Sequence, residues 1–345
     1  MNRNEKLKLA GLLVGMLVLM VGFWFILQRF EEKVPLAEVD KQEFLPNEFE
    51  EEPEEKPLGT IKLNGKKYEY FHEFETYLFM GTDVTGNEVE GDEYQGSMAD
   101  FLLLAVFDKT ENTYGFIQLN RDTMTEITLM LQDGSGMASA ELQLCTAHWY
   151  GGTSEQSCEN TVEAVSKMLG GLPIDGYYAL NMEKIPLLNN AVGGVEVTLE
   201  EDFSHVDATM KKGKTLTLTD EQAYYYIHDR YGVGDEENTS RMKRQKQYMK
   251  NFLQKAQGQM QEDVAFVNKV YMKLQEEAVT DIGGKQISRM TKVMSEGTGI
   301  GIHQFAGKTK LGQALGDGLD HVEFYPDKDS VVEIMTKLYG LKEKE

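Results

Sequence analysis

The feature that most constrains the fold is the segment FLLLAVF, residues 101–107, which consists of consecutive apolar residues. An uninterrupted apolar run is typical of a central strand covered on both faces, whereas a half-exposed strand alternates between apolar and polar residues. Two further strand-like segments flank it, TYLFMG at 76–81 and YGFIQLN at 114–120. The pattern predicts three adjacent strands that form an antiparallel meander.

A meander also predicts where three charged residues meet. Asp83 follows the first strand, Asp100 precedes the second, and Arg121 follows the third. Because neighbouring antiparallel strands run in opposite directions, these residues come to the same edge of the sheet. Each aspartate alone would be ordinary at a strand end. Two carboxylates and a guanidinium are therefore expected to meet at this edge.

The charge distribution excludes one class of function and predicts a membrane anchor. The formal net charge of −22 argues against nucleic-acid binding, which usually requires a basic surface. Residues 9–27 contain no charged side chain, and about 20 apolar residues cross a bilayer as a helix. The basic residues of the short segment before this run are Arg3, Lys6 and Lys8. We therefore predict a transmembrane helix at residues 9–28.

The positive-inside rule places residues 1–8 in the cytoplasm and the rest of the chain outside the membrane. A cleaved signal peptide is the alternative, although no A-x-A-like site follows the apolar run. Residues 29–58 are rich in acids and contain four prolines, a composition that predicts an extended stalk. Asn64-Gly65 lies between two alternating segments and predicts a hairpin with a type I′ turn. One extracytoplasmic domain is expected over residues 59–345.

Helical patterns carry a second group of cations. Thr219 and Gln222 have the spacing of a capping box for a helix that ends near His228 and Arg230. Cations are favourable at any helix C-terminus, so His228 and Arg230 alone indicate no site. A longer helix is expected from about residue 241 to 257. It places on one side the residues Arg241, Arg244 and Gln245.

Arg241 and Arg244 are expected in the first turn of that helix. The helix dipole disfavours cations there and favours a bound anion. The alternative is that Glu236 and Glu237 of the preceding loop neutralise the two arginines in surface ion pairs.

Cys145 and Cys158 are the only two cysteines of the chain. Because disulfides persist outside the cytoplasm, we predict a bridge between them. The alternative is two buried free thiols.

Six segments, taken in order, resemble the motifs of the LytR-CpsA-Psr family of cell-wall assembly proteins. They are YLFMGTD, SMADFLLLAVFD, GFIQLNRDTM, AVGGVEV, TLTDEQAYYYIHDR and SRMKRQKQY. The resemblance covers roughly residues 74–257. It implies an α/β fold in which helices cover both faces of a central mixed, largely antiparallel sheet, with a lipid groove between the sheet and the helices. A single transmembrane helix before this αβα sandwich also fits the family.

The resemblance assigns roles to individual residues. It implies metal binding by Asp83 and Asp100. The residues implied to be catalytic are Arg121, Asp122 and Arg244, with the general base left open between Asp100 and Asp122. The residues implied to bind substrate are Arg121, His228, Arg230, Arg241, Arg244 and Gln245. The sequence departs from the family pattern at Met98, Asn120, His228 and Asn238.

The implied activity is that of a membrane-anchored phosphotransferase. It moves an anionic glycopolymer, such as teichoic acid or capsule, from a polyprenyl-pyrophosphate carrier to peptidoglycan. Mg²⁺, or alternatively Mn²⁺, is expected because it binds through one or two carboxylates plus phosphate oxygens. The other hypothesis is a non-catalytic protein that binds the lipid-linked glycan or regulates the envelope. Replacing Arg121 or Arg244 by alanine is expected to weaken binding of the lipid pyrophosphate and, because surface substitutions cost little, to change folding little.

Overall fold

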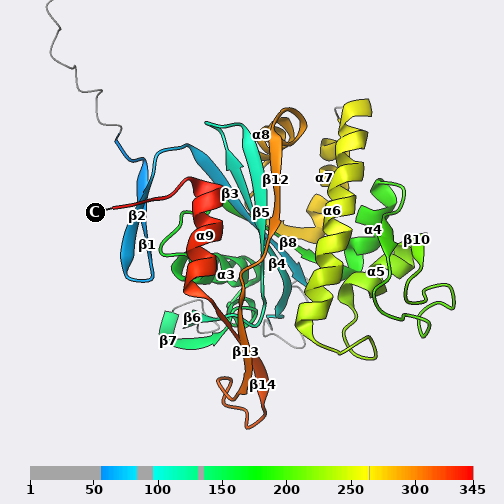
Figure 1. The fold of residues 1–345 in the computed structure, drawn as a ribbon, viewed down its shortest axis with the longest axis horizontal. Coiled ribbons are helices and arrows are strands. Elements are labelled where there is room, and N and C mark those ends of the chain that lie inside the picture. The colour runs from blue at the N-terminus through cyan, green and yellow to red at the C-terminus, as the bar shows by residue number, and fades with distance from the viewer. Residues whose placement is uncertain (1–55, 84–95, 131–135, 264, 345) are drawn as a thin grey trace, which may run out of the picture. The chain divides into compact units, whose positions relative to one another are not determined.

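The apolar run 101–107 lies in strand β4 (Ala99–Asp108), an inner strand of the central sheet (Figure 1). Strand β4 pairs antiparallel with β3 (Phe74–Thr82) and with β5 (Thr113–Leu119). This arrangement confirms the predicted meander. The computed structural model describes residues 56–83, 96–130, 136–263 and 265–344.

The remaining strands of the central sheet make it mixed. In the described part of the chain the strand order is β11-β8-β3-β4-β5-β12. Strand β8 (Gly176–Asn181) is parallel to β3, and β12 (Thr298–His303) is parallel to β5. Strand β11 (Ala278–Thr280) is antiparallel to β8. The sheet is therefore mixed with a majority of antiparallel pairings, as expected.

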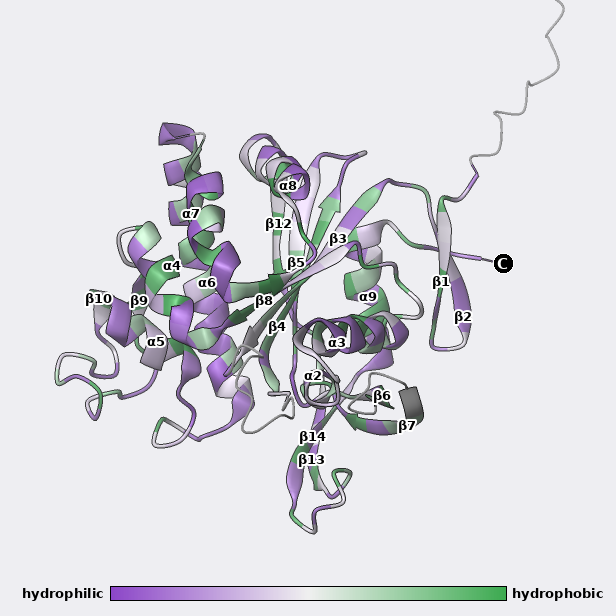
Figure 2. Ribbon diagram, turned by 180° about the vertical axis from the view of Figure 1, so that it is seen from behind, coloured by the Kyte–Doolittle hydropathy of each residue, from purple (hydrophilic) through white to green (hydrophobic). Residues whose placement is uncertain are grey.

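Helices cover both faces of this sheet, because the side chains of its strands alternate between two apolar clusters. Leu102 and Leu104 of β4 pack in one cluster with α3 (Ser154–Met168) and α9 (Lys328–Tyr339). Leu103 and the other residues of β4 that point to the opposite face of the sheet pack in a second cluster with three helices. These helices are α6 (Asn238–Glu262), α7 (Phe266–Leu274) and α8 (Gly284–Glu296). Figure 2 shows hydrophilic residues on the outer surface of α3.

A third apolar cluster joins the shorter helices to α6. It contains residues of α4 (Ile185–Ala191) and α5 (Asp220–His228), together with β9 (Glu196–Thr198). The side chains of Thr219 and Gln222 form the predicted capping box at the start of α5. The short elements next to these are η1 (Met182–Lys184), η2 (Gln275–Glu277) and β10 (Thr215–Thr217).

Hairpins complete the domain. Asn64 and Gly65 have φ of 53° and 82°, as the predicted type I′ turn requires. They connect β1 (Gly59–Leu63) to β2 (Lys66–Tyr70). Three further pairings are those of β6 (Met124–Met130) with β7 (Gly136–Gln143), of β13 (Gly307–Gly312) with β14 (His321–Pro326), and of β2 with β15 (Lys342–Glu343). A four-residue helix, α2 (Thr146–Trp149), follows β7 in the chain.

The predicted transmembrane helix at 9–28 and most of the predicted stalk at 29–58 lie outside the described residues. Within the described ranges, no helix combines the length and the apolar character that crossing a membrane requires. Both predictions therefore remain predictions.

Candidate active site

A β-bulge places Asp100 at the edge of the sheet. Gly81 pairs with Phe101 and Thr82 pairs with Ala99, so Asp100 has no opposite residue in β3. Bulges of this kind redirect a side chain at the end of a ladder. The Asp100 carboxylate accepts a hydrogen bond from α6, and Phe101 lines an apolar cavity that α6 also lines. Both side chains therefore point towards the same helix.

Asp100 links two arginines that are far apart in the sequence. Arg121 Nη1 forms an ion pair with Asp100 Oδ1, and Arg241 Nη1 donates to Asp100 Oδ2 over 3.0 Å. Asp100 and Arg241 are buried, with exposed fractions of 8% and 3%. Asp100 and Arg121 thus meet at one edge of the sheet, as the meander predicts.

Arg121 retains donors without a strong protein acceptor. Its Nη2 contacts two sulfur atoms, Met98 Sδ at 2.9 Å and Cys145 Sγ at 3.0 Å, and sulfur is a weak acceptor. Its Nε lies 3.4 Å from Asp122 Oδ1 but has no hydrogen-bond partner among the described residues. Nη2 is therefore the nitrogen that could donate to an added anion without losing an oxygen acceptor.

Two departures from the family pattern contact each other. Asn238 Nδ2 donates to Asn120 Oδ1 over 2.9 Å, which joins the end of β5 to the first residue of α6. Asn238 Oδ1 in turn accepts from Nε and Nη2 of Arg241, at 3.2 and 3.0 Å. The asparagine pair thereby fixes the Arg241 guanidinium against Asp100.

The expected position of the arginines in the first turn of α6 is wrong. The helix begins at Asn238 and its N-cap is Glu237, so Arg241 is its fourth residue and Arg244 lies in the second turn. The alternative of surface pairs with Glu236 and Glu237 is also wrong. The ion-pair partners are Asp100 for Arg241 and Glu201 for Arg244.

The side chains of Arg244 and Gln245 have their hydrogen-bond partners within the protein. Arg244 is 4% exposed. Its Nε donates to the carbonyl of Tyr226 over 3.1 Å, and its Nη atoms contact Glu201 Oε2 and the carbonyl of Asp229. Gln245 Nε2 donates to the carbonyl of Ile227 over 3.2 Å, and Gln245 Oε1 accepts from Gln118 over 2.8 Å. The prediction that replacing Arg244 changes folding little therefore rests on a surface position that the structure contradicts.

His228 lies between two carboxylates. Its Nε2 is 3.2 Å from Asp83 Oδ1, its Nδ1 is 3.4 Å from Asp229 Oδ1, and its ring stacks on Tyr224. Hydrogen bonds to Asp229 and Asp83 raise the pKa of His228 to about 9. The hydrogen bond from His228 lowers the pKa of Asp83. His228 therefore carries a positive charge at neutral pH, in the position where the family pattern has arginine.

This raised pKa predicts a loss of stability at alkaline pH. The pKa of His228 is about 9 in the folded protein, against an ordinary value of 6.5. Protonated His228 therefore contributes its full stabilisation of the folded state below pH 6.5, and this contribution is lost as pH rises to 9. We expect His228→Gln to remove this part of the pH dependence, measured by urea unfolding between pH 6 and 9.5. If the free energy of unfolding changes with pH equally in wild type and His228→Gln, the raised pKa of His228 is contradicted.

Asp122 and Arg230 complete the charged group. Asp122 is buried, its Oδ2 has no partner among the described residues, and burial raises the pKa of its carboxyl group. Its backbone carbonyl accepts from Phe324 of β14, so this hairpin borders the site. Arg230 is half-buried, bonds to the hydroxyl of Tyr231 and lies over its ring.

The predicted disulfide is wrong. Cys145 and Cys158 are both buried free thiols. The two sulfurs face different partners: Cys145 Sγ accepts from Arg121, whereas Cys158 Sγ lies 3.7 Å from His148 Nε2. Cys158 is a buried residue of α3 and packs in the apolar cluster that this helix shares with the sheet, where a thiol behaves as a small apolar side chain.

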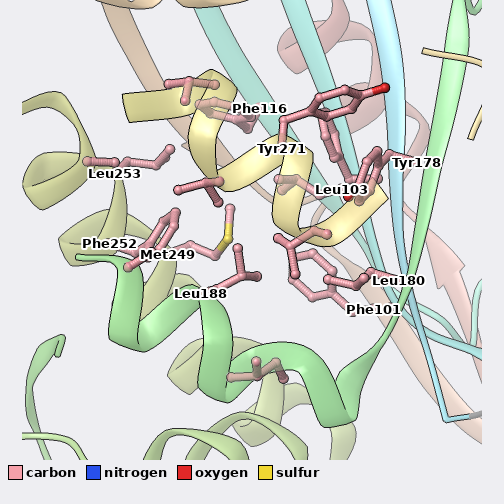
Figure 3. A pocket seen from close by; sticks show the side chains of 18 of the residues that line it. Phe101, Leu103, Phe116, Tyr178, Leu180, Leu188, Met249, Phe252, Leu253 and Tyr271 are labelled. Atoms are coloured by element: carbon pink, nitrogen blue, oxygen red, sulfur yellow. The ribbon is translucent and has the colours of Figure 1, made fainter. Parts of the chain in front are cut away.

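An apolar cavity of about 360 Å³ lies between the sheet and the helices. Figure 3 shows side chains of β4, β5 and β8 pointing towards side chains of α4, α6 and α7. Gln245 also lines the cavity, as do Gly81, Phe101 and Ile227, which lie close in the chain to the charged residues. The cavity therefore adjoins the charged group, and together they are suited to a ligand with an anionic head and an apolar tail.

The predicted metal ligands lie at the charged edge, but cations already contact them. Arginines hold both oxygens of Asp100, and His228 holds one oxygen of Asp83. Among the described residues, no group of three or more His, Cys, Asp or Glu side chains is arranged to hold a metal ion. Two carboxylates nevertheless fit Mg²⁺ when phosphate oxygens supply further ligands.

Ion pairs join Asp100, Arg121, Asp122 and Arg241 in one group and Asp83 to His228 in another. Arg244 pairs with Glu201 instead, and Gln245 lines the cavity. Sequence reasoning missed the role of Glu201, and no sequence signal pointed to it. It also missed the contact between Asn120 and Asn238. The signal for this contact was that both positions depart from the family pattern.

Several known proteins are similar to parts of the chain. Biofilm regulatory protein A of Streptococcus mutans is 29% identical over 187 residues, which are 52% of this chain and 43% of that protein. The polyisoprenyl-teichoic acid–peptidoglycan teichoic acid transferase TagU of Bacillus cereus is 28% identical over 178 residues, 52% of this chain and 51% of that protein. The chain thus spans about half the length of these curated relatives.

Solved structures share the fold. The crystal structure of B. subtilis TagV has a TM-score of 0.58 and 22% identity, and the match covers 77% of this chain and 96% of that one. A structure of TagT bound to LIIa-WTA has a TM-score of 0.55 and 18% identity, with 78% and 90% covered. The LytR_cpsA_psr family model matches residues 46–339. The chain therefore belongs to the LytR_cpsA_psr family.

Proposed function

We propose that the protein is a phosphotransferase that moves an anionic glycopolymer from a polyprenyl-pyrophosphate carrier to peptidoglycan. The observation that carries this proposal is the apolar cavity of about 360 Å³ beside a charged group that contains Arg121 and the buried Arg241. A polyprenyl chain suits the cavity, and a pyrophosphate suits the arginines, because Arg donates to phosphate oxygens in a planar fork. The similarity to a teichoic acid transferase of Bacillus cereus supports a transferase role.

Arg121 is the residue best suited to bind the reacting phosphate. Its Nη2 contacts only sulfur atoms, so this nitrogen can donate to a phosphate without giving up a strong acceptor. The attacking group would be a sugar hydroxyl of peptidoglycan, which displaces polyprenyl phosphate from the phosphorus nearest the glycan. Arg121 would stabilise the charge that develops on that phosphate.

The charges of the site support a divalent cation. The charged group contains five cationic side chains and five carboxylates. The cations are Arg121, His228, Arg230, Arg241 and Arg244, and the carboxylates are those of Asp83, Asp100, Asp122, Glu201 and Asp229. A dianionic pyrophosphate would leave this group with excess negative charge. Mg²⁺ held by Asp83 and Asp100 would restore the balance, and it would supply charge neutralisation at the phosphates. Mn²⁺ is the alternative ion.

We further propose that residues 9–28 anchor the protein in the cell membrane and that the domain lies outside the cell. The support is the uncharged run from residue 9 to residue 27 and the basic residues before it. Lipid carrier and peptidoglycan are then both accessible.

A single reaction tests the proposal. The purified protein is incubated with a polyprenyl-pyrophosphate oligosaccharide, peptidoglycan fragments and Mg²⁺, and products are identified by mass spectrometry. We expect a glycan joined to peptidoglycan through a phosphodiester, and no product when EDTA replaces Mg²⁺. Lipid binding without product under any metal condition would instead identify a non-catalytic binding protein.

The lipid role of the cavity predicts the effect of filling it. Met249 of α6 and Leu103 of β4 face each other across the cavity (Figure 3). We expect Met249→Trp to displace the polyprenyl chain and weaken lipid binding at least about tenfold, since roughly 1.4 kcal/mol corresponds to tenfold in affinity. Retained lipid is measured by mass spectrometry of purified protein. Leu187→Trp, at an exposed position on α4, is the control, and unchanged binding by Met249→Trp would contradict the assignment.

A further inference from the structure

The environment of Arg244 differs from that of Arg121. Each of the three guanidinium nitrogens of Arg244 has an oxygen acceptor from the protein, and the group lies over the ring of Phe203, 5.2 Å from its centroid. By contrast, Arg121 Nη2 has only sulfur acceptors, and Arg121 Nε lies 3.4 Å from Asp122 Oδ1 without a hydrogen-bond partner among the described residues. A phosphate could bind Arg244 only by displacing acceptors that would then remain buried, which is costly.

The acceptors of Arg244 lie at the C-terminal end of α5. Tyr226 is in the last turn of this helix, and Asp229 is its C-cap. The last carbonyls of a helix have no partner within the helix and favour a nearby cation. Gln245, the next residue of α6, donates to the carbonyl of Ile227 in the same turn. Two consecutive side chains of α6 therefore hold the end of α5.

Glu201 supplies the counter-charge for this arrangement. Its side chain is 14% exposed and pairs with Arg244 Nη1. It also packs closely against the loop between α5 and α6: a Cβ atom at Gly234 would lie 2.2 Å from Glu201 Oε1. A buried arginine without its carboxylate would be strongly destabilising. Glu201 thus fixes Arg244, and Arg244 fixes the segment that carries His228 and Arg230.

We propose that Arg244 is a positioning residue that acts with Glu201 to hold the end of α5, and that it does not bind the pyrophosphate itself. The inference rests on the proposed function for the role of His228 and Arg230 at the phosphates. It replaces the catalytic and substrate-binding role that the family resemblance implies for Arg244.

The variant Glu201→Gln separates the two roles of Arg244 by the sign of its effect. If Arg244 bound phosphate, removing the competing carboxylate would free it and strengthen binding. If Arg244 positions α5, the same change loosens the segment and weakens binding. The probe is farnesyl pyrophosphate with Mg²⁺, bound to the full chain in detergent micelles and measured by calorimetry. We expect binding to weaken about 10–100-fold, as for other residues that orient a ligand-binding group. Unchanged or tighter binding would overturn the proposal.

Hydrogen exchange gives a second measurement that does not depend on the proposed function. In Glu201→Gln we expect faster amide exchange in residues 225–231, with the strands of the central sheet unchanged. Glu163→Gln, which alters an exposed pair with Lys167, is the matched control and should change neither measurement. If wild type fails to bind the probe, the proposed function fails, while local exchange still decides the role of Arg244. Unchanged exchange in residues 225–231 would overturn that role.

Discussion

Replacing Asp100 by alanine is expected to lower the free energy of unfolding by about 3–5 kcal/mol, the usual cost of removing one partner of a buried ion pair. The reason is that Asp100 is the counter-ion of both Arg121 and Arg241. Arg241 is 3% exposed, and water cannot replace the lost carboxylate. Burial and the positive charge of Arg121 already lower the pKa of Arg241 to about 10.

Urea unfolding of wild type and Asp100→Ala at pH 7 measures this effect. The matched control is Glu163→Ala, which removes an exposed carboxylate paired with Lys167 and should cost only about 0–1 kcal/mol. A loss of less than about 1 kcal/mol for Asp100→Ala would mean that solvent or other groups neutralise the arginines. Asp100→Ala also alters the proposed metal site. The transferase activity of this variant should therefore be measured only at temperatures where the variant is folded, so that loss of metal binding is separated from unfolding.

The second large effect is expected at Arg121. We expect Arg121→Ala to reduce glycan transfer by about 10²–10³-fold, the usual cost of removing one donor that stabilises transition-state charge. Arg121→Lys keeps the charge but lacks the planar fork, so we expect an intermediate rate. Unfolding should change less than for Asp100→Ala, since Asp100 keeps its pair with Arg241.

Single-turnover transfer from a polyprenyl-pyrophosphate oligosaccharide to peptidoglycan fragments measures the rate. Arg289→Ala is the control, because Arg289 is half-exposed and pairs with Glu75 away from the site. It should leave both transfer and stability near wild type. If Arg121→Ala transfers glycan at the wild-type rate but unfolds at a much lower urea concentration, Arg121 is a structural partner of Asp100 and the proposed chemistry is wrong.

Much of the fold could be predicted from short segments. Seven apolar residues at 101–107 indicate a strand covered on both faces, and Asn64-Gly65 indicates a hairpin turn. Both predictions are confirmed. Asp100 precedes the second strand of the meander and Arg121 follows the third. Because these neighbouring strands run in opposite directions, both residues come to the same edge of the sheet. Motif order also identified the family.

The partners of individual charges could not be predicted in this way. Local sequence left open a bound anion or pairs with Glu236 and Glu237 for Arg241 and Arg244, but the ion-pair partners are Asp100 and Glu201. A bulge of one residue decides the direction of Asp100, and the packing of α6 against α5 decides which acceptors enclose Arg244. These contacts depend on residues that lie far apart in the chain, and side-chain periodicity carries no information about them.

The cysteines show the same limit. Composition and the predicted compartment favoured a disulfide between Cys145 and Cys158, yet each sulfur faces a different side chain. A disulfide requires two Cβ atoms within about 4.5 Å in a suitable orientation, and only the packed structure sets that geometry. The sequence by itself determined the strands, the edge where charges gather and the family. Only the tertiary structure decided which charges neutralise one another, because pairing depends on distance and burial in three dimensions.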